Sequence, residues 1–269
     1  MEETIEKNFD KAFAIAWSEN QGSYSEDIAK KTLNFIKLQG LKVNTVLDIC
    51  CGSANFLKEM KNNGKDCTGT EILDSYVEYD KSKYPNINFI KTEDILGFDD
   101  LGKFDLITCN HDVINMLPTI EDWGTFFSKV YEHLNNGGLL IFDYYTKRKL
   151  QDWNEVSCDE SEKLDYIRNV VSKNNSTSIS NIYFINLNYN PNAEENNSLD
   201  KNYSFNDYEK KYKKTEDTTV EYYFENAEIM EYIKKAGYRY LITTDSNFSP
   251  VSGLENMNRI HVIAIKREV

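Results

Sequence analysis

Asp48, Glu71 and Asp94 each stand at the end of one of three successive short apolar runs. The carboxyl ends of parallel strands meet at one edge of a sheet, where ligands bind in such folds. A carboxylate at Glu71 could accept hydrogen bonds from both hydroxyls of a ribose. A carboxylate at Asp94 could accept from the exocyclic amine of adenine, while the N–H of Ile95 meets a ring nitrogen. The order of these acids predicts a nucleoside site.

The loop after Asp48 indicates which kind of nucleoside would fit. It runs Ile49-Cys50-Cys51-Gly52-Ser53-Ala54 into a predicted helix. Small side chains let a ligand approach the backbone, and the helix start offers free N–H groups. A dinucleotide loop would read G-x-G-x-x-G, whereas only Gly52 is present and Asp48 would repel a pyrophosphate. The loop favours a nucleoside with a cationic or zwitterionic tail, with an ordinary strand–helix turn as the alternative.

His111 lies two residues beyond the run Phe104–Cys109, on the expected ligand side. Imidazole titrates near neutrality, so His111 could act as a general base. The alternative is a packing or hydrogen-bonding histidine. His133 lies near a predicted helix end, where a cation is favoured, and His261 lies within a predicted strand, so we interpret both as structural.

These residues need a sheet to bring them together, and short apolar runs alternate with helical patterns from residue 41 to residue 142. This alternation is typical of a doubly wound α/β fold with a mostly parallel sheet. The predicted strands are Val43–Ile49, Lys65–Glu71, Ile87–Lys91, Phe104–Cys109, Leu139–Phe142, Tyr238–Thr243 and Arg259–Lys266. The predicted helices are Asn55–Asn62, Leu73–Lys83, Ile114–Leu117, Trp123–Leu134 and Asn226–Ala236. Together they predict a Rossmann-like, seven-stranded sheet.

Two further segments are expected around this sheet. Helical patterns at 4–17 and 24–38, separated by a turn at 20–23, predict a helical lid over residues 1–40. The cofactor-binding domain would then comprise 41–150 and 225–269, with an inserted antiparallel β cap at 151–224. The predicted cap strands are Tyr166–Val171, Ile179–Tyr189, Lys210–Thr215 and Thr219–Phe224.

Composition argues against several classes of protein. The 269 residues carry a formal net charge of −13, which is unsuited to a nucleic-acid backbone. No apolar run approaches the roughly 18–20 residues of a membrane span, and the acidic N-terminus differs from a signal peptide. The five cysteines form no CxxC pair and no zinc pattern with the three histidines. We therefore expect no metal and a cytoplasmic location, where thiols stay reduced.

Five segments resemble the successive motifs of class I S-adenosylmethionine-dependent methyltransferases: LDICCGSANF, GTEIL, KTEDI, FDLITCNHDVIN and HLNNGGLLIFD. They are similar to the small-molecule branch that includes sugar N,N-dimethyltransferases and has an antiparallel layer after the fifth strand. The resemblance covers Phe9 to the C-terminus and is strong over 43–143. Over 151–224 it is only topological. Ala54 replaces the second glycine of the usual D-x-x-x-G-x-G. Alanine tolerates most right-handed conformations, so we expect cofactor binding to be kept, and the conformation of the loop is left open.

The resemblance implies S-adenosyl-L-methionine as the cofactor. The residues that it implies around the cofactor are Trp17, Tyr24, Asp48, Cys50, Gly52, Ser53, Glu71, Ile72, Asp94, Ile95, Cys109 and Asn110. The first two belong to helices that close over the cofactor in similar proteins. The next four flank the methionine part, the following four hold the ribose and adenine, and the last two lie beside the methionine end.

The implied reaction is methyl transfer to a nitrogen or oxygen of a small molecule, in which the protein mainly aligns the reactants and excludes water. A non-catalytic S-adenosylmethionine-binding protein and an RNA or protein methyltransferase are the alternatives. Cys109-Asn110-His111-Asp112 stands where a nucleic-acid methyltransferase would carry Asn/Asp-Pro-Pro-aromatic. We expect a small-molecule methyl acceptor as the partner and no membrane, and a homodimer is left open.

Overall fold

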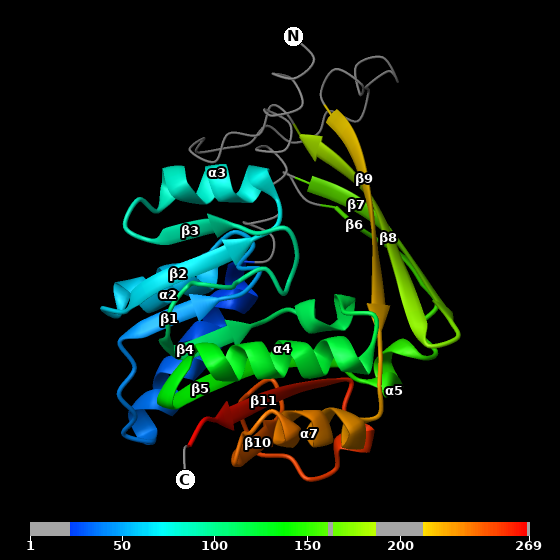
Figure 1. Cartoon of the computed structure of the whole chain (residues 1–269). Coiled ribbons are helices and arrows are strands. Elements are labelled where there is room, and N and C mark those ends of the chain that lie inside the picture. The colour runs from blue at the N-terminus through cyan, green and yellow to red at the C-terminus, as the bar shows by residue number, and fades with distance from the viewer. Residues whose placement is uncertain (1–21, 161–163, 187–211, 268–269) are drawn as a thin grey trace.

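The computed structural model describes residues 22–160, 164–186 and 212–267, which form two β-sheets with helices around the larger one (Figure 1). The larger sheet has the strand order β10-β11-β5-β4-β1-β2-β3. Its strands are β1 (Thr45–Asp48), β2 (Asp66–Glu71), β3 (Asn88–Lys91), β4 (Phe104–Cys109), β5 (Leu134–Tyr145), β10 (Tyr240–Thr244) and β11 (Arg259–Ile265). β11 runs opposite to the other six strands of this sheet, so it pairs antiparallel with both β10 and β5. The predicted α/β fold with a mostly parallel, seven-stranded sheet is confirmed.

Helices cover both faces of this sheet, because its central strands are buried on both sides. One core contains Trp123 of α4 and Ile229 of α7, and the other contains Ile28 and Met60 from helices on the opposite face. The helices are residues 22–38, α2 (Asn55–Asn62), α3 (Asp74–Lys83), α4 (Ile120–His133), α5 (Lys147–Leu150) and α7 (Asn226–Lys235), with 3-10 turns η1 (Val113–Met116) and η2 (Leu254–Asn256). Among the described helices, none has the length and apolarity to cross a membrane.

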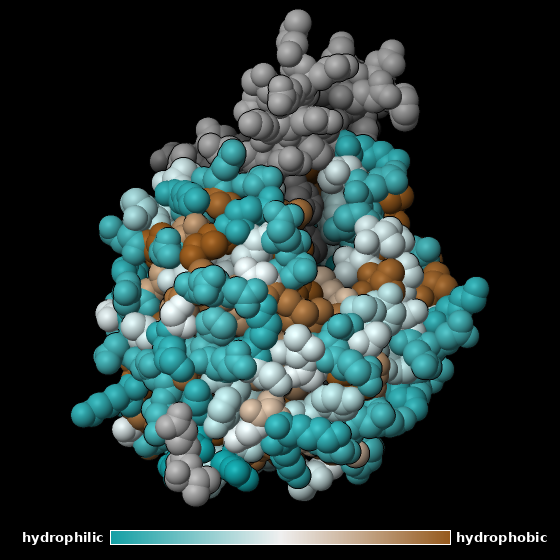
Figure 2. All heavy atoms as spheres, viewed as in Figure 1, coloured by the Kyte–Doolittle hydropathy of each residue, from teal (hydrophilic) through white to brown (hydrophobic). Residues whose placement is uncertain are grey.

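The smaller sheet stands beside the carboxyl ends of the larger sheet's parallel strands (Figure 1). It is antiparallel throughout and consists of β6 (Glu155–Asp159), β7 (Leu164–Lys173), β8 (Ser176–Asn186) and β9 (Tyr212–Tyr222). Asn115 of η1 joins the two sheets, since its Nδ2 donates to the carbonyls of Tyr145 at 3.0 Å and Tyr222 at 2.9 Å. On the face shown in Figure 2, hydrophobic residues gather where the sheets approach each other.

The structure differs from the prediction in several elements. The two strands predicted at 210–215 and 219–224 form the single strand β9. Asp217, between them, accepts hydrogen bonds from Asn181 at 2.8 Å and Tyr183 at 3.1 Å, which keeps this polar segment in the sheet. The helix stop predicted at 135–138 lies within β5, and residues 22 and 23 are helical where a turn was expected. The strand β6 and the helix α5 were not predicted.

The helix predicted at 4–17 lies outside the described residues, as does Trp17. The boundaries of the lid, cap and cofactor-binding domain stay predictions.

Candidate active site

The loop between β1 and α2 adopts left-handed backbone conformations at alternate residues. Cys50, Gly52 and Ala54 have φ angles of 53°, 53° and 55°. The chain thereby turns toward β2, where the Cys51 N–H donates to the carbonyl of Thr70 at 2.9 Å. The loop conformation that the sequence left open at Ala54 is therefore left-handed. A left-handed conformation costs a non-glycine residue roughly 1–2 kcal/mol, so this position carries backbone strain.

Glu71, at the end of β2, holds this loop through its carboxylate. Its Oε2 accepts from the Gly52 N–H at 2.9 Å, and its Oε1 accepts from the N–H groups of Ile72 at 2.8 Å and Leu73 at 3.0 Å. Burial raises the pKa of Glu71, and the three N–H donors oppose that rise. A carboxylate has about four acceptor positions, so some capacity remains for a ribose hydroxyl.

A small pocket lies where β1 and β4 end. Asp48 is buried there and accepts from the Thr108 hydroxyl at 2.6 Å and from Asn110 Nδ2 at 3.5 Å. Burial raises the pKa of Asp48 to about 7, against the effect of these hydrogen bonds. Asn110 Oδ1 is buried and accepts no hydrogen bond within the described ranges. The residues lining the pocket are Ser25, Asp48, Cys50, Cys51, Phe56, Asn110 and His111.

The chemistry of this pocket fits the methionine part of S-adenosylmethionine. The Asp48 carboxyl and the Asn110 carbonyl are hydrogen-bond acceptors, and a buried acceptor without a partner is costly. The ligand part carries a positively charged sulfur and an ammonium group with N–H donors. Both features would stabilise an ionised Asp48 and satisfy Asn110.

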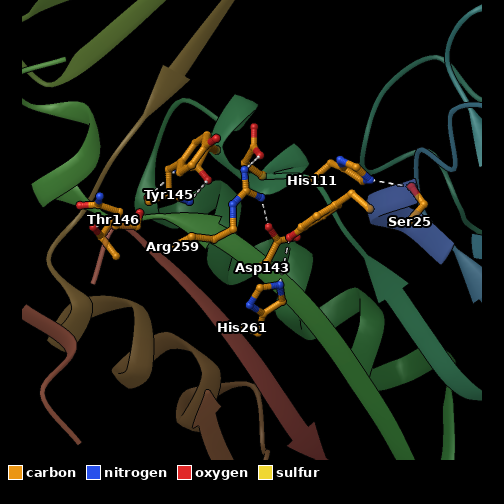
Figure 3. Close-up of polar contacts among 11 residues, drawn as sticks. Ser25, His111, Asp143, Tyr145, Thr146, Arg259 and His261 are labelled. Carbon is orange, nitrogen blue, oxygen red and sulfur yellow. Dashed lines mark hydrogen bonds and ion pairs between the residues drawn. The ribbon is translucent and has the colours of Figure 1, made fainter. Parts of the chain in front are cut away.

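His111 joins this pocket to the helix at 22–38. Its Nε2 lies 2.7 Å from Ser25 Oγ (Figure 3). Its ring meets the Tyr24 ring edge-on, with the ring centroids 4.7 Å apart. The Tyr24 hydroxyl lies 3.2 Å from Nε2 of His261. Burial lowers the pKa of His111, and nearby carboxylates oppose this effect. The imidazole is therefore neutral at pH 7.

Next to His111, Arg259 lies among carboxyl groups at the same sheet edge. The guanidinium hydrogen-bonds to Asp143 and to Asp112, and lies 4.0 Å from the centre of the Tyr145 ring (Figure 3). Burial raises the pKa of Asp143, but Arg259, His261 and His111 together outweigh this effect and hold the pKa below its ordinary value. Because β11 runs antiparallel, its first residue lies at the edge where β4 and β5 end.

The other predicted cofactor residues lie along this edge in different environments. Asp94 is exposed and accepts from the Leu96 N–H at 2.8 Å, whereas Ile95 is buried in the core. Ser53 Oγ accepts from Asn55 Nδ2 at 2.9 Å. Cys109 is fully buried, and burial raises the pKa of its thiol well above the ordinary value. The contacts predicted between these residues and a cofactor stay predictions.

His133 and His261 were interpreted as structural, and that interpretation stays a prediction. His133 Nδ1 lies 2.8 Å from the Lys129 carbonyl in the last turn of α4, and His261 is buried within β11. In the described parts of the chain, no group of three or more His, Cys, Asp or Glu side chains could hold a metal ion.

Several polar residues at this edge were missed by sequence reasoning, among them Ser25, Arg259 and Glu221. Serine within a helix has no distinctive pattern. The position of Arg259 at the start of a strand could have indicated it, but only with the strand direction known. Glu221 lies in a segment whose strand boundaries were predicted wrongly.

This fold and site define the class I methyltransferase architecture, and comparison with known proteins agrees. A structure of an S-adenosylmethionine-dependent methyltransferase from Clostridium acetobutylicum aligns with a TM-score of 0.74 and 18% identity, covering 90% of this chain and 92% of that one. The amino pentose methyltransferase CalS10 of Micromonospora echinaspora aligns with a TM-score of 0.68 and 15% identity, covering 94% and 96%.

A family model described as a methyltransferase domain matches residues 18–174, more than half of the chain. The chain therefore belongs to this family of S-adenosylmethionine-dependent methyltransferases. Among curated proteins it is similar to YqeM of Bacillus subtilis, a protein named as a methyltransferase, with 26% identity over 129 residues. That match covers 45% of this chain and 51% of YqeM, so it spans about half the length of this relative.

Proposed function

We propose that the protein transfers a methyl group from S-adenosylmethionine to a nitrogen or oxygen atom of a small molecule. The observation that carries this proposal is the Oδ1 of Asn110, which has no partner among the described residues and lies beside the buried carboxyl of Asp48 in a pocket that His111 also lines. S-adenosylmethionine supplies a methyl group on a positively charged sulfur, which makes the methyl carbon electrophilic. Asp48 and Asn110 would hold its methionine part through charge and hydrogen bonds.

Along the same edge, Glu71 and Ile72 would hold the ribose and adenine, and Asp94 with the N–H of Ile95 would read the adenine edge. Asp94 lies close enough to Cys50 to contribute to the raised pKa of that thiol, behind burial and two other carboxylates. Glu71, Asp48 and Asp94 therefore all lie within electrostatic reach of Cys50, which supports one extended ligand along this edge.

The protein's own contribution would be alignment and exclusion of water. His111 reaches both the pocket and the arginine–carboxyl cluster through its neighbour Asp112, so it is placed to contact the acceptor. Its lowered pKa favours a neutral, hydrogen-bonding imidazole over an imidazolium. The general-base role remains a hypothesis, and a pH–rate profile separates it from positioning.

A small-molecule acceptor is supported by the net charge of −13 and by structural neighbours named as sugar enzymes. CalS10 is described as an amino pentose methyltransferase, and KedS8 of Streptoalloteichus as a sugar N-methyltransferase. All five cysteines are free, which supports the proposed cytoplasmic location. Size-exclusion chromatography with light scattering would decide whether a homodimer forms.

The proposal is tested first by calorimetric titration with S-adenosylmethionine, its demethylated product S-adenosylhomocysteine and NAD. We expect binding of the first two and none of NAD. The second step measures S-adenosylhomocysteine release with matched amine and hydroxyl compounds. Binding without release across such a panel would favour the non-catalytic alternative, and absence of binding would contradict the proposal.

A further inference from the structure

Around Arg259 the buried acids outnumber the base that pairs with them. Arg259 hydrogen-bonds to Asp112 and Asp143, and Glu221 of β9 lies within hydrogen-bond reach of Asp112. Glu221 is only 3% exposed, yet its Oε2 has no hydrogen-bond partner in the described part of the chain. Asp143 Oδ1 is unpartnered in the same way.

A buried carboxylate without a partner must be neutralised, either by a proton or by a cation. Burial and the neighbouring Asp112 raise the pKa of Glu221 to about 9, while Arg259 and Arg168 oppose the rise. At pH 7 the free protein therefore holds a proton on Glu221. Arg259 pairs with Asp112 and Asp143, and Arg168 and Lys149 lie within electrostatic reach of Glu221, yet Glu221 Oε2 has no hydrogen-bond partner among the described residues.

We propose that Glu221 and Asp112 bind the protonated amine of the methyl acceptor, and that Glu221 takes a proton from it. This inference rests on the proposed methyltransferase function, and it assigns nitrogen, not oxygen, as the atom that receives the methyl group. The position suits the role: Asp112 follows His111 directly, two residues beyond Asn110 of the cofactor pocket. Glu221 approaches the same point from the smaller sheet, where its side chain lies within hydrogen-bond reach of Asp112.

The proposed step is balanced in charge and atoms. An N–H bond of the ammonium breaks, an O–H bond forms on ionised Glu221, and the electron pair stays on nitrogen. That pair then forms the N–C bond as the methyl–sulfur bond breaks, and the bonding electrons pass to sulfur. The products are a methylated ammonium and a neutral thioether. A hydroxyl acceptor would bring no positive charge to this cluster.

The smaller sheet continues the polar surface beyond Glu221. Arg168 Nε donates to Asn181 Oδ1 at 2.9 Å, and Asn181 Nδ2 donates to Asp217 at 2.8 Å. By strand register these residues point to the same face of the sheet as Glu221. An amine that also carries hydroxyl groups would match this surface.

The test uses methylammonium chloride as the probe, with the full chain saturated by S-adenosylhomocysteine. At ten times its dissociation constant we expect methylammonium to raise Tm by about 2–5 °C, and tetramethylammonium, which lacks N–H groups, to have no effect. Since the cation displaces the proton on Glu221, its affinity should rise up to about tenfold per pH unit from pH 7 toward pH 9. Glu221→Gln should remove both effects and still bind S-adenosylhomocysteine.

Other titratable groups lie around Glu221, and a change in their charge between pH 7 and pH 9 would also alter cation binding. The pKa of Tyr145 is raised by burial and that of His111 is lowered by burial, so neither titrates there. Lys149 also faces the cluster, and its pKa is lowered by burial. A Lys149→Met variant, which should keep the pH dependence, separates its titration from that of Glu221.

Glu216→Gln is the matched control, because Glu216 is exposed on the opposite face of the same strand. An absent or pH-independent methylammonium effect in the wild type would overturn the inference, as would an equal effect in Glu221→Gln. Loss of S-adenosylhomocysteine binding in Glu221→Gln would also overturn it, by assigning Glu221 to the cofactor. If wild type binds neither S-adenosylmethionine nor its product, the proposed function itself fails, whatever methylammonium does.

Discussion

Replacing Glu71 with glutamine tests the cofactor site where its geometry is best defined. Glutamine keeps the shape of the side chain and one carbonyl oxygen, which can still accept from the N–H groups of Ile72 and Leu73. Its amide nitrogen cannot accept from the Gly52 N–H, which now bonds to Oε2 at 2.9 Å. The variant therefore loses one hydrogen bond to a charged group within the loop, and the negative charge available to a ribose.

The expected loss is about 1.5–3 kcal/mol, the range for hydrogen bonds to charged groups. This corresponds to a dissociation constant for S-adenosylmethionine that rises roughly 10- to 100-fold. Glu71→Ala should do more, because it leaves three backbone N–H groups without their acceptor and so loosens the loop as well. The alanine variant should therefore lower Tm further than the glutamine variant does.

Calorimetric titration measures the affinities, and circular dichroism melting checks the fold. Glu93→Gln is the control, since Glu93 is an exposed acid just after β3 and should bind as wild type does. If folded Glu71→Gln binds S-adenosylmethionine within twofold of wild type, Glu71 does not contact the ligand and the ribose assignment is wrong.

Three further changes test other parts of the structure. Ala54→Gly should raise stability in urea unfolding by about 0.5–1 kcal/mol, because glycine adopts the left-handed φ of 55° without strain; a lower stability would contradict this. Burial raises the pKa of Asp80 to about 8, so its ionisation destabilises the folded state increasingly as pH rises from about 4 to 8. Asp80→Asn should therefore gain stability over wild type by up to about 1.4 kcal/mol per pH unit in that window, and the exposed control Glu78→Gln should not. His111→Gln should raise the Michaelis constant of the acceptor with an unchanged pH–rate profile, whereas loss of the acidic limb and a roughly 10²–10⁴-fold slower rate would establish His111 as the base.

The sequence was sufficient to predict the larger sheet and the edge at which its acids meet. Strands such as Phe104–Cys109 are buried on both faces, so they appear as short apolar runs whose ends are visible in the sequence. Asp48, Asn110 and His111 were predicted at strand ends, and the structure brings all three into one pocket.

The remaining features depend on contacts that no local pattern encodes. The sequence predicts two strands because Glu216, Asp217 and Thr218 are three consecutive polar, exposed residues, whereas the hydrogen bonds of Asn181 and Tyr183 to Asp217 keep β9 continuous. The left-handed conformation of Ala54 follows from the hydrogen bonds between its loop and β2, which lie outside the segment itself. A preference for right-handed conformations is a weak predictor against such tertiary contacts.

The two groups of buried acids at this sheet edge differ in how the protein satisfies them. Glu71 accepts three backbone N–H groups, and Asp48 accepts from Thr108 and Asn110, so these carboxyls are oriented before any ligand arrives. Glu221, by contrast, has an oxygen without a hydrogen-bond partner in the parts of the chain that the structure describes, and a neighbouring carboxyl. Such an arrangement is costly unless something binds to it. Glu71 and Asp48, which are already oriented, suit the cofactor, because the same cofactor binds in every turnover. Glu221, which is not satisfied, suits the ammonium group of the acceptor, from which it would take a proton.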